Sequence, residues 1–280
     1  MYLKDKQPLK ILVSALMTLT VLFASCNNQT TPPQRAGILT GAPNFRDLGG
    51  YPSEDGKHTI WQKIFRSQML AQVSDSDMVK IKELKIKTVI DFRADDEVLK
   101  EPSRLPEGLN IVRLPIDVGS NDTLQIMQKV MAGALDSAQC VAFMQTANRR
   151  FVTEFTSQYK EFFNILLQPD SYPIVFHCTA GKDRTGFAAA MLLSALDIEW
   201  DTVMNDYLLT NQYLKPQQLI PQIPEQAIPA LRQMWGVQPS YLNAAKEEIL
   251  KHYGSINNYL HQELNMGQAE KTRLKQCLLE

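Results

Sequence analysis

A cysteine and an arginine stand six positions apart in a segment rich in groups that bind anions. Residues 172–196 read YPIVFHCTAGKDRTGFAAAMLLSAL, and between Cys178 and Arg184 lie Thr179, Ala180, Gly181, Lys182 and Asp183. A thiolate at Cys178 would be stabilised by nearby backbone N–H groups and by the cations Lys182 and Arg184, which makes it a nucleophile near neutral pH. The segment therefore predicts nucleophilic chemistry on a bound anion.

The other residues of this loop also have a chemical use. The small residues Ala180 and Gly181 let the backbone curl so that its amides converge on one anion, with Thr179 and Lys182 beside them. The guanidinium of Arg184 can hold two phosphate oxygens and stabilise charge in the transition state. Thr185 can donate its hydroxyl to the sulfur when an intermediate breaks down. We expect no metal and no organic cofactor, because the loop supplies both the nucleophile and the positive clamp.

The elements that position the loop follow from its flanks. Ile174, Val175 and Phe176 form an apolar, β-prone run, and an Ala/Leu-rich helical run follows Gly186. In an open α/β sheet, such a loop lies at the carboxyl end of a strand and at the N-terminus of a helix. Unpaired N–H groups and the helix dipole favour an anion there, and a phosphate group fits that description.

The same residues carry a family resemblance. The order His177, Cys178, five residues, Arg184, Thr185, Gly186 resembles the phosphate-binding loop of the cysteine-dependent protein tyrosine phosphatases. Its Gly-Lys-Asp-Arg-Thr-Gly variant is similar to a bacterial branch whose members act on phosphotyrosine proteins and often on phosphoinositides. Further similar stretches are 44–51, 65–67, 88–93, 206–211 and 253–260. The resemblance spans roughly residue 42 to the end and is weakest over 117–168.

This resemblance implies a phosphate monoester hydrolase that acts through a phosphocysteine intermediate on phosphotyrosine proteins, with phosphoinositides as a further substrate class. A dedicated inositol-phosphate or phosphoinositide phosphatase is one alternative. Another is a lipoprotein that binds phosphate without turnover, against which the presence of Cys178, Asp183, Arg184 and Thr185 argues. A rhodanese-like sulfurtransferase fits less well, because it has no need of an aspartate acid.

A phosphatase of this kind needs a general acid to protonate the leaving oxygen, and three aspartates compete for that role. Asp183 is the first choice, because it lies inside the loop and the resembling branch uses its loop aspartate in this way. Asp91 ends an apolar strand, where we favour a structural ion pair with Arg93 or a loop arginine. For Asp117 we favour an exposed turn residue.

Several neighbours of the loop are candidate supporting residues. Lys182 adds charge that a single phosphotyrosine does not require and that a second phosphate on an inositol ring would use. The alternative is a solvated lysine that raises the potential of the loop. Arg46 and Asp47 are candidate partners that steady the loop, unless this stretch is only a turn. His177 is expected to orient the backbone rather than to donate a proton.

The N-terminus has the layout of an export signal. Residues 11–25 read ILVSALMTLTVLFAS behind Lys4, Lys6 and Lys10, and this run is shorter than the roughly 20 residues of a membrane-spanning helix. Residues 23–26 (FASC) resemble a bacterial lipobox. We therefore predict a lipoprotein signal peptide at 1–25, lipidation at Cys26 and a flexible tether at 26–41, with plain secretion as the alternative. The protein would be exported in a bacterium and anchored to a membrane of the cell envelope, on the periplasmic side.

Composition limits the classes of partner. The 280 residues carry 29 Lys and Arg against 30 Asp and Glu, a formal net charge of -1, so no global positive field is available for nucleic acid. An anion must instead be bound locally. The spacings of Cys140, Cys178 and Cys277 suit neither a zinc site nor a disulfide framework. Cys140 and Cys277 are expected to be small buried hydrophobic residues, with a bridge between them unsupported.

The remaining pattern predicts an α/β fold. Residues 77–84 have helical spacing, and 87–92 and 109–116 read as strands. With the strand–loop–helix segment they fit a three-layer-like sandwich, in which helices flank a central, mostly parallel sheet and a helical region follows at the C-terminus. This is the protein tyrosine phosphatase fold that the resemblance implies. Residues 42–280 are predicted to form the catalytic domain, in which the aromatic stripe at 155–167 packs into the core and the part of 122–168 before Arg149 is a candidate cap over the site.

Overall fold

A five-stranded sheet with the strand order β1-β2-β5-β3-β4 forms the centre of the fold. Its strands are β1 (Arg46–Asp47), β2 (Ile64–Ser67), β3 (Thr88–Asp91), β4 (Asn110–Arg113) and β5 (Ile174–His177). β1 is antiparallel to β2, and all other neighbours are parallel. The register pairs Ser67 and Asp91 with His177, so the carboxyl ends of three strands meet at one edge. Ligand sites of open α/β sheets form at that edge.

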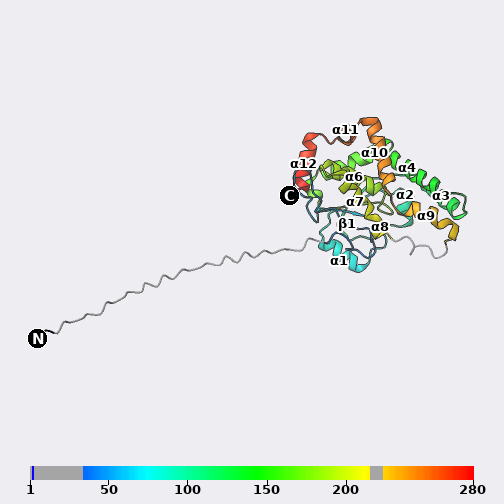
Figure 1. Ribbon diagram of the computed structural model, residues 1–280. Helices are drawn as coiled ribbons and strands as arrows, with labels where there is room; N and C mark the ends of the chain where they lie inside the picture. Colours follow the sequence, from blue (N-terminus) through cyan, green and yellow to red (C-terminus); the bar gives the residue numbers. More distant parts are fainter. Residues whose placement is uncertain (1, 3–33, 215–222) are drawn as a thin grey trace. The chain divides into compact units, whose positions relative to one another are not determined.

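The computed structural model describes residues 2, 34–214 and 223–280 (Figure 1). Apart from residue 2, the predicted signal peptide lies outside the described residues, as do the lipidation site Cys26 and the first part of the predicted tether. Within the described part of the chain, no helix combines the length and apolar character needed to span a membrane.

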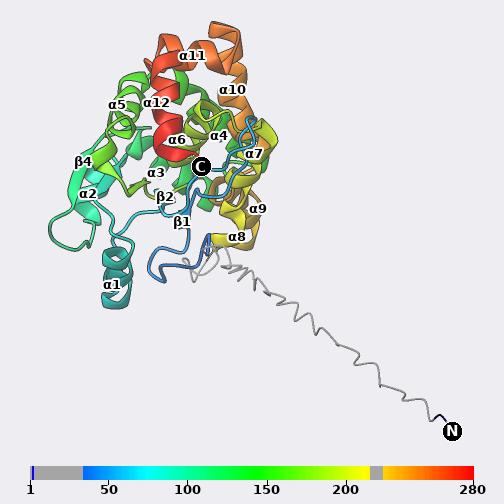
Figure 2. The ribbon, with the colours of Figure 1, turned by 90° about the vertical axis from the view of Figure 1, so that its left-hand side faces the viewer.

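Helices lie on both sides of the sheet, as Figures 1 and 2 show with α1 on one side and α6, α10 and α12 on the other. Their bounds are α1 (Asp75–Glu83), α2 (Asp95–Lys100), α3 (Ser120–Met131), α4 (Ser137–Thr153), α5 (Thr156–Leu166), α6 (Arg184–Ala195), α7 (Trp200–Leu208), α8 (Thr210–Tyr213), α9 (Ile228–Trp235), α10 (Pro239–Tyr253), α11 (Ile256–Gln262) and α12 (Gln268–Leu278). Short 3-10 helices occupy Pro169–Ser171 and Glu225–Ala227. The C-terminal helical region is therefore confirmed.

Alternate strand residues serve two hydrophobic cores, because successive side chains of a strand point to opposite faces. Phe65, Val89 and Val175 pack with α1 and the segment before β1. Ile90 and Phe176 belong to the larger cluster, which includes residues of α4, α5, α6 and α10. The sheet thus lies between two apolar layers, and the predicted α/β sandwich with a mostly parallel sheet is confirmed.

The long segment before β5 forms packed helices. Its aromatic residues Tyr159, Phe162 and Phe163 on α5 are buried in the larger core, as the sequence predicted for that stripe. α4 also packs closely, against α9 and α10, with Cys140 and Met144 buried. The candidate cap, which is the part of 122–168 before Arg149, therefore includes most of α4, a helix that packs within the domain.

Packing against the domain begins before residue 42, the predicted first residue of the catalytic domain. The Arg35 carbonyl accepts the N–H of Asp47, and the Arg35 guanidinium donates to the carbonyls of Asp47 and Gly49. Leu39 is buried in the smaller core. Apolar and hydrogen-bonding contacts hold this stretch, so residues 35–41 belong to the folded unit.

Candidate active site

The predicted loop joins the carboxyl end of β5 to the N-terminus of α6. Cys178 follows the last residue of β5, and Arg184 is the first residue of α6. The Cys178 side chain is buried, and Cys140 and Cys277 are also free thiols. The strand–loop–helix arrangement that the sequence indicated is thus the one found, with the cysteine at the sheet edge where three strands end.

The loop turns its carbonyl groups away from its own centre. The donors to these carbonyls are the N–H of Met69 to Thr179 (3.0 Å), the Asn44 side-chain amide to Ala180 (2.9 Å) and the Arg66 guanidinium to Gly181 (2.8 Å). None of the backbone N–H groups of residues 179–184 donates a hydrogen bond to another described residue. A row of unpaired donors at a helix N-terminus is an anion-binding arrangement.

Gly181 is the position where this loop requires glycine. Its φ of +68° lies in the left-handed region, and a Cβ built there would be 2.3 Å from the carbonyl oxygen of Ser67. Both conditions exclude a side chain, because L-residues avoid that region and backbone cannot move aside cheaply. The close approach of the loop to β2 thus depends on this residue.

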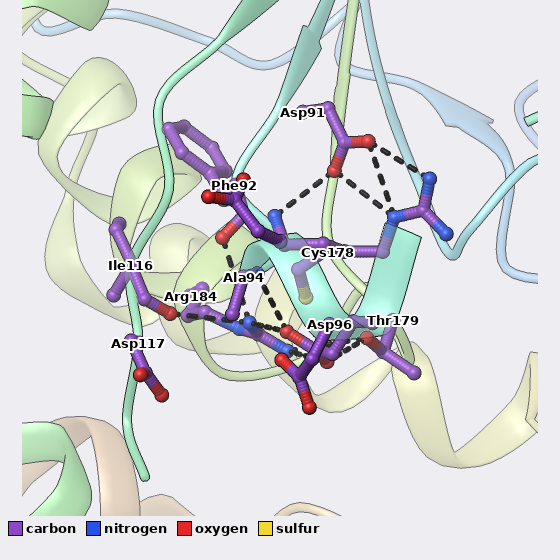
Figure 3. Close-up of polar contacts among 12 residues, drawn as sticks. Asp91, Phe92, Ala94, Asp96, Ile116, Asp117, Cys178, Thr179 and Arg184 are labelled. Carbon is purple, nitrogen blue, oxygen red and sulfur yellow. Dashed lines mark hydrogen bonds and ion pairs between the residues drawn. The ribbon is translucent and has the colours of Figure 1, made fainter. Parts of the chain in front are cut away.

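Arg184 is held by a carboxylate that the sequence did not single out. Its Nη1 and Nη2 lie 2.6 and 2.8 Å from the Glu97 oxygens, and Nη1 also donates to the Ile116 carbonyl at 3.2 Å. The Thr179 hydroxyl donates to Glu97 as well. Figure 3 shows Arg184 between Ile116 on one side and Thr179 on the other, next to Cys178. Glu97 on α2 therefore orients the Arg184 guanidinium.

The environment of Glu97 keeps it ionised. Burial alone raises its pKa, but the hydrogen bonds and charge of Arg184 outweigh burial and lower the pKa to about 2. Its only sequence signal is a place in the first turn of α2, where Glu97 accepts the N–H of Ala94. Asp95 and Asp96 share that acidic turn, so the sequence offered no reason to choose among the three.

The first-choice acid, Asp183, forms an ion pair with its neighbour in the loop. Lys182 Nζ lies 2.6 Å from Asp183 Oδ2, and the two side chains are only 8% and 18% exposed. Asp183 occupies the N-cap position of α6, but its carboxylate makes no capping hydrogen bond. Its other oxygen, Oδ1, has no hydrogen-bond partner among the described residues and is therefore available for chemistry. Because the Lys182 ammonium is shielded from water, the interpretation of Lys182 as a solvated lysine does not hold.

Asp91 forms the structural ion pair with Arg93 that the sequence favoured. Its carboxylate pairs with Arg93, whose Nη2 is 2.8 Å from Oδ2, and Arg93 also donates to the Glu101 carbonyl and the Ser103 hydroxyl. Burial raises the pKa of Asp91, but His177 and Arg93 outweigh burial and hold that pKa below its usual value. These contacts occupy Asp91 away from the loop's N–H groups.

His177 is fully buried beside the nucleophile. Its Nδ1 is 3.2 Å from the Cys178 carbonyl, and its Nε2 is 3.8 Å from Asp91. Burial lowers the pKa of His177 below its usual value. This placement fits a backbone-orienting residue.

Asp117 was weighed both as an exposed turn residue and as a general acid, and its position has a feature of each. Its side chain is exposed and accepts the N–H of Gly119 at 2.8 Å, as in a turn. Its neighbour Ile116 nevertheless contacts Arg184 through its carbonyl. Asp117 therefore lies next to a residue that contacts Arg184, which places it near the site as well as in a turn (Figure 3).

The two residues proposed to steady the loop differ in position. Arg46 binds Asp206 (3.1 Å) and the side-chain oxygen of Asn44 (2.5 Å), and Asn44 in turn donates to the loop. Asp47 does not reach the loop: its carboxylate accepts the N–H groups of Gly49 and Gln62. The expectation for Asp47 is corrected, because successive residues of β1 point to opposite sides.

Other partners of the site were not assigned a role from the sequence. Arg66 and Asp206 lie in stretches that carried the family resemblance, and Asn44 opens the first of them. The Tyr159 hydroxyl donates to the Arg184 carbonyl at 3.2 Å. The Thr185 hydroxyl is buried without a hydrogen-bond partner among the described residues, which leaves it free to meet the sulfur.

A buried cysteine, unpaired N–H groups and an arginine at the helix start together define a cysteine-dependent phosphatase. The sequence profile of the tyrosine phosphatase family matches residues 38–280. The chain belongs to the tyrosine phosphatase family.

Two relatives agree with this assignment. A Cupriavidus necator protein named as a tyrosine-protein phosphatase is 31% identical over 233 residues, which are 81% of this chain and 83% of that protein. The triple specificity protein phosphatase PtpB of Mycobacterium tuberculosis is 27% identical over 276 residues, which are 86% of this chain and 98% of that protein.

Two solved phosphatase-like structures show a distant similarity to this chain. TpbA of Pseudomonas aeruginosa has a TM-score of 0.30 at 15% identity, over 71% of this chain and 96% of TpbA. The catalytic core of Siw14 has a TM-score of 0.34 at 14% identity, over 71% of this chain and 94% of that core. Both scores are below 0.5.

Proposed function

We propose that this protein hydrolyses phosphotyrosine in proteins through a phosphocysteine intermediate on Cys178. The observation that carries the proposal is the set of unpaired N–H groups of residues 179–184 around a buried cysteine, with Arg184 at the start of α6. Such donors stabilise the charge of a transferring phosphoryl group without reorganising. The site thus supplies a nucleophile and an anion cradle from one short loop.

The two steps use residues already at the site. In the first, the Cys178 sulfur attacks phosphorus, the bond to the ester oxygen breaks, and that oxygen takes a proton from Asp183. In the second, Asp183 removes a proton from water, the water oxygen attacks phosphorus, and the phosphorus–sulfur bond breaks. Thr185 donates a hydrogen bond to the departing sulfur.

Arg184 keeps a donor for the substrate despite its ion pair. Nη1 and Nη2 bind Glu97, whereas Nε–H makes no hydrogen bond to a described residue. Nη2 also donates to the Thr179 hydroxyl oxygen at 3.3 Å, so Nε–H is the group we assign to a phosphate oxygen. Glu97 would then keep the fork in place while charge develops.

We extend the proposal to phosphoinositides as a further substrate class. The support is the Lys182 ammonium, which lies shielded beside the loop and, among the described residues, forms an ion pair only with Asp183. A second phosphate on an inositol ring would compete with Asp183 for that ammonium. The relative named for triple specificity is consistent with a site of this kind that accepts more than one ester.

The test compares wild type, Cys178→Ser and Cys277→Ser on a phosphotyrosine peptide, a phosphoserine peptide, phosphoinositides and phytate. Cys277→Ser is the matched control, since it removes a free thiol from α12. We expect turnover by wild type and Cys277→Ser, and a loss of about a thousandfold or more in Cys178→Ser. Activity that survives Cys178→Ser would refute the mechanism. Phosphate binding without any turnover by wild type would favour a binding protein.

We also propose that the protein is an exported lipoprotein held on a membrane by acyl chains on Cys26. The support is the order of the sequence: basic residues, the apolar run at 11–25, then a lipobox-like FASC. Expression of the full chain in a bacterium should place it in the membrane fraction, and Cys26→Ser should release it. Equal fractionation of both chains would favour plain secretion or no export.

A further inference from the structure

We infer that Arg66 is a positioning residue that sets the peptide planes of the phosphate loop, and that the buried group it belongs to places a net positive charge beneath the loop. This group, the Asp206 cluster, consists of Arg46, Arg66 and Asp206. The inference rests on the proposed function, because it concerns the affinity of the same loop for phosphate.

The Arg66 guanidinium bridges a carboxylate and the loop. Its Nη1 lies 2.6 Å from Asp206 Oδ2, and its Nη2 donates to the Gly181 carbonyl at 2.8 Å. The residue is fully buried, so neither contact is exchanged with water. A planar fork held at one end by an ion pair presents its other end in a fixed direction. Asp206 thereby aims Arg66 at the loop.

Fixing a carbonyl fixes the next N–H, because the peptide group is planar and trans. With the Gly181 oxygen bound to Arg66, the N–H of Lys182 must point to the opposite side, toward the centre of the loop. Asn44 acts in the same way on the Ala180 carbonyl and so orients the N–H of Gly181. Donors from outside the loop therefore decide where the anion-binding amides point.

The Asp206 cluster also carries unbalanced charge. Arg46 and Arg66 both bind Asp206, and two cations against one carboxylate leave a net positive charge. The Tyr51 hydroxyl donates to Asp206 at 2.9 Å and adds no charge. Burial lowers the pKa of Arg66 to about 10, so it stays a cation at neutral pH. Because the cluster is buried, salt screens its effect on a bound phosphate only weakly.

A purely structural role gives a different expectation. The cluster joins β1, β2 and α7, so we expect substitutions that leave one of its charges unpaired to lower stability. Among molecules that remain folded, however, a structural role leaves the affinity of the loop for an anion unchanged. Affinity measured on folded protein is therefore the readout that separates the two roles.

The experiment measures dissociation constants for inorganic phosphate and vanadate, by calorimetry or protein fluorescence, well below the melting temperature of each variant. Arg66→Lys keeps the charge but cannot serve Asp206 and Gly181 together, and we expect about tenfold weaker binding. Arg66→Gln also loses the charge, and we expect about a hundredfold. KM for p-nitrophenyl phosphate should rise in the same order, with the Lys variant partly rescued relative to Gln.

Asp77→Asn is the matched control. Asp77 is as buried as Asp206, but it accepts hydrogen bonds from Thr40, Gly41 and Ser74, away from the loop. It should lose stability while its phosphate affinity stays within twofold of wild type. The inference is overturned if both Arg66 variants, folded, bind phosphate and vanadate as wild type does, or if Asp77→Asn weakens binding equally.

These outcomes are separate from those of the proposed function. If wild type hydrolyses no ester but binds phosphate or vanadate, the proposed function fails while the Arg66 variants still decide the inference. If wild type binds neither anion, the inference itself is wrong, because it states what makes the loop bind them.

Discussion

The Arg184 guanidinium meets the Glu97 carboxylate edge to edge, with Nη1 2.6 Å from Oε2 and Nη2 2.8 Å from Oε1. Glu97 also accepts the N–H of Ala94 and the hydroxyl of Thr179. One carboxylate therefore caps its own helix, orients the arginine of the loop and binds a second loop residue. These contacts join α2 directly to the phosphate loop.

Removal of the Glu97 charge should slow catalysis. In Glu97→Gln the guanidinium loses its two-point partner, and kcat/KM for p-nitrophenyl phosphate should fall by about ten- to a hundredfold. Asp95→Asn is the control, since that residue of α2 is 85% exposed and pairs with Arg113. A Glu97→Gln enzyme as active as Asp95→Asn would show that Arg184 needs no partner.

The same pair should make stability depend on pH. The pKa of Glu97 in the folded protein is about 2, below its ordinary 4.5. A lowered pKa gives stability that is fully present above pH 4.5 and is lost as the pH falls toward 2, at most about 3 kcal/mol. Urea unfolding of wild type and Glu97→Gln should thus differ most at pH 7 and converge in acid. A difference that grows in acid contradicts the assignment.

Gly181 should tolerate no side chain. Gly181→Ala combines a positive φ with a clash against the Ser67 carbonyl, whereas Gly108→Ala has a similar φ of +84° with nothing within 4 Å. The control should lose about 1 kcal/mol from backbone strain alone. Gly181→Ala should lose more stability and also phosphate affinity. If Gly181→Ala and Gly108→Ala lose the same stability and Gly181→Ala still binds phosphate, the loop can shift to accommodate the side chain.

The identity of the general acid can be read from leaving groups. Asp183→Ala should lose much more activity on esters of poor leaving groups than on p-nitrophenyl phosphate, because only poor leaving groups need a proton. Asp117→Ala is the comparison, since that residue lies one position from Ile116 at the clamp. If Asp117→Ala shows the leaving-group dependence and Asp183→Ala does not, the acid is Asp117.

Lys182 should distinguish substrate classes. Lys182→Ala should reduce turnover of phosphoinositides by a larger factor than turnover of phosphotyrosine peptides, because a single phosphate is held by the amides and Arg184. The variant also removes a cation beside the anion-binding loop, so both substrates lose some activity. Reduction of both rates by one factor would leave Lys182 without a role in selecting the substrate.

The loop and its frame could be predicted from the sequence because they are contiguous. Residues 174–195 contain a β-prone run, small residues and a helix-forming run, and each pattern is local. Alternation and helical spacing also identified α1 and β3 within a few residues. The docked stretch at 35–41 was missed because it directly follows the polar, Pro-containing run at 27–35 and because its burial depends on α1 and β1.

The sequence by itself determined the chemistry: a nucleophile, an arginine and small residues within the seven positions from Cys178 to Arg184. Only the tertiary structure decided which distant groups orient them. Glu97 is 87 positions from Arg184 and Arg66 is 115 from Gly181, and spacing carries no information across such separations. Arg46 and Asp47 are adjacent, yet only Arg46 belongs to the buried cluster behind the loop. The packing of β1 and α7 selects between them, since strand neighbours point to opposite faces.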